Sequence, residues 1–128
     1  MSVLSKIFAI LMCFVAFSEC RVCPTIDIRN HPHNLRVLRG CTRIEGHLKI
    51  VLIERAEAYT DFEHIFPELR EIRDYLLLFR VMQLDTLGRM FPNLRSIGGE
   101  NLFHGFALVV YDMEHLQEVC GEFLEESC

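Results

Sequence analysis

The stretch Phe66-Pro67-Glu68-Leu69-Arg70-Glu71-Ile72 recurs 25 residues later as Phe91-Pro92-Asn93-Leu94-Arg95-Ser96-Ile97. A fainter copy, Cys41-Thr42-Arg43-Ile44, precedes both and keeps the spacing of their last isoleucine. A shared Phe-Pro-x-Leu-Arg-x-Ile pattern at a fixed period is typical of a repeat protein, so chance similarity is improbable.

Each copy leads into an apolar stretch that is typical of a β-strand: residues 48–53, 75–81 and 106–111. The third begins later than the period requires, and a loop at Gly98-Gly99-Glu100 accounts for the excess. Repeats of this length, each one strand and a return segment, cannot bury a face alone and therefore stack. We predict a mainly β fold with short helices, in which parallel strands form a right-handed β-helix or leucine-rich-repeat-like solenoid.

The segments between the strands carry apolar residues at about three-residue spacing, which predicts short return helices packed against the core. These residues are Leu84, Leu87, Met90 and Phe91, and then Met113, Leu116 and Val119. The alternative fold is an ordinary α/β domain whose two Phe-Pro segments match by coincidence.

Alternation along the strands assigns their side chains to two faces. The predicted inward set is Leu48, Ile50, Leu76, Leu78, Ala107 and Val109. The predicted outward set is Lys49, Val51, Leu77, Phe79, Leu108 and Val110. Because the outward set is unusually apolar, either a later segment covers it or it is an exposed binding surface.

The N-terminus has the pattern of a secretory signal peptide, in which Lys6 precedes an apolar run of 11 residues, Ile7–Phe17. A bilayer span needs roughly 20 such residues. Small residues permit cleavage after Ser18 or after Cys20. The second site leaves four cysteines instead of five, and an oxidising compartment favours an even number. We therefore predict a signal peptide at residues 1–20 and a secreted, extracellular product without a membrane span.

Neither catalysis nor a cofactor is indicated. Beyond the predicted signal peptide the only serines are Ser96 and Ser127, and neither lies in a nucleophile-elbow motif. His31 and His33 are separated by Pro32, which favours a turn over a metal site. The net charge of −5 does not suggest a nucleic-acid-binding surface. We predict a binding module that is not an enzyme and needs no cofactor or metal.

Five motifs in order resemble the first L domain of the insulin and insulin-like growth factor receptors, over about Cys23–Glu118. They are Cys23-Pro24-x-x-Asp27-Ile28-Arg29-Asn30, Cys41-x-x-Ile44-Glu45-Gly46-His47-Leu48, Asp74-Tyr75-Leu76-Leu77-Leu78-Phe79-Arg80-Val81, Phe91-Pro92-Asn93-Leu94 and Leu102-Phe103. The resemblance implies a right-handed β-helix closed at its N-terminal end by a disulfide between Cys23 and Cys41. We assign an incomplete L domain to residues 21–118 and an acidic tail to residues 119–128, in which Cys120 and Cys128 would pair.

The resemblance also implies that an insulin-like peptide binds to the central sheet. The family contacts that match this chain are Arg29, Asn30, Leu52, Leu77, Phe79, Leu102 and Phe103. Alternation selects Leu77 and Phe79 independently, and it adds Lys49 and Val51 to the predicted surface. The chain departs from the family pattern in having Lys49 in place of an uncharged polar residue, Glu54 and His104 in place of aromatic residues, and Gly105 in place of an amide.

Three functional hypotheses follow. The chain is a secreted decoy or carrier for an insulin-like peptide, the N-terminal part of a receptor tyrosine kinase, or a structural or adhesion domain that has lost hormone binding. In the family the hormone site is shared with other receptor domains or chains, so an isolated module is expected to bind weakly.

Overall fold

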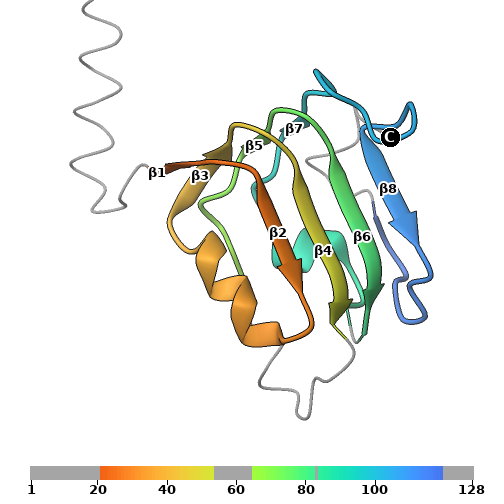
Figure 1. The fold of residues 1–128 in the computed structure, drawn as a ribbon. Helices are drawn as coiled ribbons and strands as arrows, with labels where there is room; N and C mark the ends of the chain where they lie inside the picture. The colour runs from red at the N-terminus through yellow and green to blue at the C-terminus, as the bar shows by residue number, and fades with distance from the viewer. Residues whose placement is uncertain (1–20, 54–64, 83, 120–128) are drawn as a thin grey trace, which may run out of the picture.

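The computed structural model describes residues 21–53, 65–82 and 84–119. The predicted signal peptide and its cleavage site, Glu54, and the predicted Cys120–Cys128 pair lie outside these residues. The described residues form two four-stranded parallel sheets, with short helices in segments of chain that return from one sheet to the other (Figure 1). The predicted mainly β fold with parallel strands and short helices is confirmed, while the right-handed solenoid stays a prediction.

The chain alternates between the two sheets, so that each pass adds one strand to each sheet. One sheet has the order β1 (Arg21–Cys23), β3 (Cys41–Ile44), β5 (Glu71–Ile72) and β7 (Ser96–Ile97). The other has the order β2 (Ile26–Arg29), β4 (Leu48–Ile53), β6 (Leu76–Val81) and β8 (Leu108–Tyr111). A 3-10 helix, η1 (Pro32–Leu38), links β2 to β3, and the short helix α2 (Leu87–Met90) lies between β6 and β7.

The sequence repeat corresponds to neighbouring strands in the first sheet. Ile72 of β5 pairs in register with Ile97 of β7, which is the 25-residue period of the sequence. The rings of Phe66 and Phe91 lie 6.0 Å apart between centroids, and the Phe66 amide donates to the Met90 carbonyl at 2.8 Å. Equivalent residues of successive repeats therefore stack directly on one another.

The core lies between the sheets and draws on both. Leu48, Ile50, Leu76 and Leu78 are fully buried, as alternation along β4 and β6 predicts. The first sheet, η1 and α2 contribute to the same cluster through Ile44, Ile72, Leu35, Leu38, Leu87 and Met90. Cys23 and Cys41 close the N-terminal end with a disulfide whose Cα atoms are 5.8 Å apart, which confirms the pairing that the family resemblance implied.

The face assignment in the last strand was wrong. Leu108 pairs with Leu76 and Val110 with Leu78, and both pack against the core, whereas Val109 lies on the outer face. The predicted inward positions, Ala107 and Val109, are therefore off by one residue. A run of consecutive apolar residues has no polar position to set its phase, so pairing with β6 decides it.

Only the first of the two predicted return helices is present in the described residues. Helix α2 begins after Thr86, whose hydroxyl accepts a hydrogen bond from the Arg89 amide at 3.1 Å and caps the first turn. The segment of Met113, Leu116 and Val119 instead forms turns, although all three side chains pack against the core. Their spacing therefore predicted the burial correctly and the helix wrongly.

Candidate ligand-binding face

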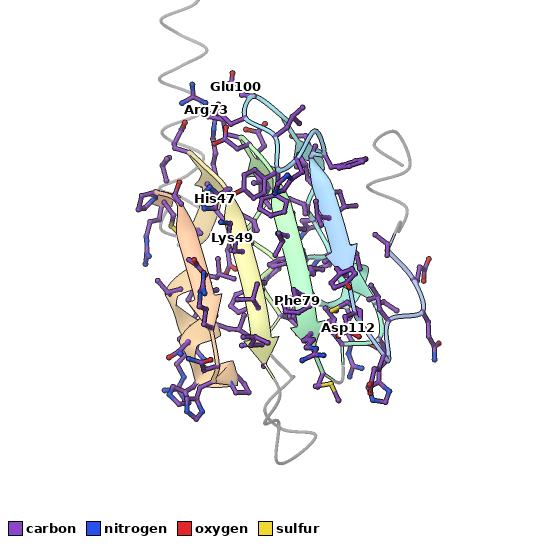
Figure 2. The ribbon with its side chains drawn as sticks, turned by 45° about the vertical axis from the view of Figure 1, so that its right-hand side comes forward. His47, Lys49, Arg73, Phe79, Glu100 and Asp112 are labelled. Atoms are coloured by element: carbon purple, nitrogen blue, oxygen red, sulfur yellow. A yellow bond between two sulfur atoms is a disulfide. The ribbon has the colours of Figure 1, made fainter. Side chains whose placement is uncertain are left out.

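The outer face of the β2-β4-β6-β8 sheet carries most of the predicted site residues in two transverse rows. Strand register aligns Asp27, Lys49, Leu77 and Val109 in one row, and Arg29, Val51, Phe79 and Tyr111 in the other. Figure 2 shows Lys49 on β4 and Phe79 on β6, with Asp112 beyond the end of β8. The pairing of the strands therefore brings together side chains from all four strands of this sheet.

The face is packed more tightly than the sequence indicated. Leu77 lies on the outer face, as alternation predicts, but it retains only 8% exposure because Val51 and Tyr75 pack beside it. Phe79 is half-buried: its ring stacks on Tyr111 at a centroid distance of 5.5 Å. The surface is thus a second apolar cluster whose members support one another from the same side of the sheet.

A tight hairpin borders this cluster. Phe103 and Phe106 exchange two backbone hydrogen bonds of 2.9 Å, and His104 and Gly105 between them have φ values of 47° and 86°. Two central residues with positive φ are the signature of a type I′ turn, which matches strand twist. The turn holds Leu102 and Phe106 exposed, at 50% and 63%.

Buried and charged groups fix the segment that leads into the hairpin. The buried carboxylate of Asp74 accepts hydrogen bonds from the backbone and side-chain amides of Asn101 at 3.3 and 3.1 Å. Arg73 and Glu100 form an ion pair at the same end of the sheet (Figure 2). The hairpin is therefore preorganised, which lowers the entropic cost of using it in binding.

An aromatic row crosses the face beside Lys49. The rings of His47 and Tyr75 stack at 4.6 Å, and Phe103 follows 5.5 Å from Tyr75. The Lys49 ammonium lies 5.8 Å from the centroid of Tyr75 and 5.6 Å from that of Phe103. These distances are in the range of cation–π attraction.

Two groups on the face have shifted pKa values. The hydrogen bonds from Arg29 hold the pKa of the Asp27 carboxyl below its ordinary value of 3.8. Burial lowers the pKa of His47 from 6.5, and repulsion from Lys49 adds to this shift. Asp27 is therefore charged and His47 neutral at pH 7.

The structure places the predicted site residues on the β2-β4-β6-β8 sheet, at the ends of its strands and in the adjoining hairpin segment, and they differ in exposure. Arg29, Asn30 and Leu102 are exposed, Lys49, Leu52, Phe79 and Phe103 are half-buried, and Val51 and Leu77 are buried. Sequence reasoning missed His47, Asp74, Tyr75 and Tyr111. His47 lies two residues before Lys49, and Tyr75 two residues before Leu77, so extending the alternation would have found both.

The described residues offer little for other kinds of site. Within them, no group of three or more His, Cys, Asp or Glu residues is placed to hold a metal ion. Among these residues, no helix has both the length and the apolar character that a membrane span requires.

Comparison with known proteins identifies the family. The Receptor L domain family model matches residues 40–126, more than half of the chain. The chain belongs to the Receptor L domain family. It is 49% identical over 98 residues to an insulin-like peptide receptor of Branchiostoma lanceolatum, 48% over 99 residues to the human insulin receptor-related protein, and 46% over 115 residues to the insulin-like growth factor 1 receptor of Xenopus laevis.

These matches cover 77%, 77% and 88% of the chain. They cover only 7%, 8% and 8% of the relatives. The resemblance to insulin-receptor-type L domains that the sequence motifs indicated is therefore confirmed, and the chain corresponds to a small part of each relative.

Proposed function

We propose that this L domain binds an insulin-like peptide outside the cell, on the outer face of the β2-β4-β6-β8 sheet. The observation that carries the proposal is the partly exposed cluster of Leu52, Phe79, Phe103 and Val109 beside a rigid hairpin. Aromatic side chains on a preorganised surface are typical of interface hot spots. The named relatives, two of which are peptide receptors by name, support a peptide as the ligand.

The domain is proposed to act by binding alone, without catalysis. It serves either as a secreted decoy or carrier or as the ligand-binding part of a longer receptor. The names of two relatives, an insulin-like peptide receptor and an insulin-like growth factor 1 receptor, favour the receptor. A transcript that continues in frame into further receptor domains would establish that the domain is part of a receptor.

We also infer that the two sheets are two faces of a right-handed β-helix, in which each turn of the chain contributes one strand to each sheet. The support is the regular alternation of strands between the sheets and the parallel pairing of every neighbour. A coil of this kind supplies a rigid concave or flat sheet, and repeat proteins commonly bind partners on such surfaces.

The test is a pair of neighbouring substitutions on β6. Phe79→Ala should weaken binding of labelled human insulin-like growth factor 1 or insulin by about 2 kcal/mol, the hot-spot scale. Because the Phe79 ring also stacks on Tyr111, the same change should cost about 1 kcal/mol of stability. Leu78→Ala, in the core, should cost about 2–5 kcal/mol of stability.

Binding is measured by surface plasmon resonance on the secreted protein, and stability by denaturant unfolding. If Phe79→Ala leaves hormone binding unchanged while the protein stays folded, this face is not the site. If the wild-type protein binds neither hormone, the result supports the structural or adhesion role instead.

A further inference from the structure

The positive charges on the outer face are not equivalent. Arg29 binds both carboxylate oxygens of Asp27 at 2.9 Å, and Arg80 pairs with Asp112. Lys49 forms no ion pair within the residues that the structure describes, and its ammonium instead lies over the rings of Tyr75 and Phe103. Lys49 is therefore a cation whose charge is not neutralised by these neighbours.

The surroundings of Lys49 strengthen its attraction for an anion. Its in-register neighbours on the next two strands are Leu77 and Val109, and Leu77 is buried. Aromatic rings attract a cation but carry no net charge, so the ammonium keeps its full charge and its hydrogen-bond donors. Charge-assisted hydrogen bonds are stronger where apolar groups exclude water. Asp27, the in-register neighbour of Lys49 on β2, attracts the ammonium through space, but both of its carboxylate oxygens accept hydrogen bonds from Arg29 and it forms no ion pair with Lys49.

A purely structural role for Lys49 explains less. The hairpin that carries Phe103 is held by its two backbone hydrogen bonds, by Asp74 through Asn101, and by the Arg73–Glu100 pair. None of these contacts involves Lys49. The rings of Tyr75 and Phe103 in turn restrict the long lysine side chain, so that less conformational entropy is lost when an anion binds.

We propose that Lys49 is a specificity-determining residue of this face and that it pairs with an acidic side chain of the bound peptide. The inference rests on the proposed function and adds the chemistry of the ligand. An Asp or Glu flanked by apolar residues fits best, because the carboxylate would meet Lys49 while its neighbours cover Leu77, Phe79 and Phe103. The net charge of the chain is −5, so most of its surface repels an acidic ligand. A positive charge at Lys49 would therefore direct such a ligand to this face.

The experiment selects displayed, disulfide-closed peptides with randomised positions on the secreted full chain. Selections run in parallel on the wild-type protein, Lys49→Glu, and Arg43→Gln, a control that changes an exposed arginine on the other sheet. The wild-type and control proteins should enrich Asp and Glu beside apolar residues, and Lys49→Glu should enrich Lys and Arg. Circular dichroism and thermal unfolding establish that each variant is folded.

Individual peptides from the wild-type selection then give a double-mutant cycle. Replacing Lys49 by Gln, or the peptide's acid by its amide, should each weaken binding about tenfold, and both together little more than either alone. Lys49→Arg keeps the positive charge and should retain the preference for acidic peptides. It replaces Lys49→Gln as the test variant if Lys49→Gln does not fold.

Two results would overturn the inference: enrichment of acids that is unchanged in Lys49→Glu, or additive losses in the cycle. If Lys49→Gln binds the hormone as tightly as the wild-type protein does, the inference about Lys49 is overturned and the proposed function stands. Acid-selective peptide binding without any hormone binding would support the inference and contradict the proposed function.

Discussion

Gly98 shows how a single residue positions the candidate site. A Cβ atom at this position would lie 2.5 Å from the carbonyl oxygen of Arg73, a distance that real contacts do not reach. The Gly98 amide also donates to the Ile72 carbonyl at 2.7 Å. The absence of a side chain therefore allows the loop to approach β5 closely, and this loop continues into the Phe103–Phe106 hairpin.

We expect Gly98→Ala to lower the free energy of unfolding by about 1–3 kcal/mol, because backbone must move to admit the new methyl group. Gly88→Ala is the matched control. A Cβ at Gly88 meets no atom within 4 Å, and the residue lies in α2, so this change should stabilise the protein by about 0.5–1 kcal/mol. Urea unfolding measures both, and equal effects of the two changes would contradict the close approach at Gly98.

At the scale of elements, the sheet has an aligned row of left-handed residues. Asn30, Leu52, Arg80 and Asp112 have φ values of 73°, 58°, 48° and 51°. The register of the neighbouring residues places them side by side across β2, β4, β6 and β8. The backbone of each strand therefore bends at the same position across the sheet. After this row of residues, the side chains that point inward are one position later than strict alternation would place them.

This row explains why alternation alone describes the strands incompletely. Strict alternation from Leu48 would turn Leu52 inward and Ile53 outward, yet Ile53 is fully buried and Leu52 is half-exposed. The sequence carries no glycine at these four positions to mark the turn. In β4 and β6 the inward residues before the row were predictable from the pattern, whereas the side chains at the row depend on a backbone conformation that the pattern does not encode.

Leu52 tests whether the row limits stability. We expect Leu52→Val to cost about 1–3 kcal/mol, because a β-branched residue is poorly tolerated at positive φ. Leu52→Asn should be nearly neutral despite its polarity, because asparagine adopts this conformation readily. Thermal unfolding compares the two variants, and a valine variant more stable than the asparagine variant would show that the left-handed conformation is not costly there.

At the scale of the whole molecule, the repeat was the part of the fold that sequence could predict. Phe66 and Phe91 each begin a Phe-Pro-x-Leu-Arg-x-Ile sequence, and both rings are buried against each other in the core. Because the two positions have the same structural role, the same residue types occur there, and the repeat can be recognised in the sequence. The site was predictable only in part. Leu77 and Phe79 follow from alternation, but the contacts of Lys49 with Tyr75 and Phe103 join residues 26 and 54 positions away, which local patterns cannot relate.

The disulfide between Cys23 and Cys41 offers a test of how far the repeats depend on one another. The bond joins residues 18 positions apart, so its loss should cost about 3 kcal/mol through the entropy of the unfolded chain. In each sheet a strand pairs only with its immediate neighbours, so the loss should be felt first in β1, β3 and η1. A variant with Cys23→Ser and Cys41→Ser should therefore exchange amide hydrogens faster there, while β6 stays protected. Mass spectrometry of peptides after hydrogen exchange measures this gradient. Equal loss of protection in β3 and β6 would mean that the described strands unfold together as one cooperative unit.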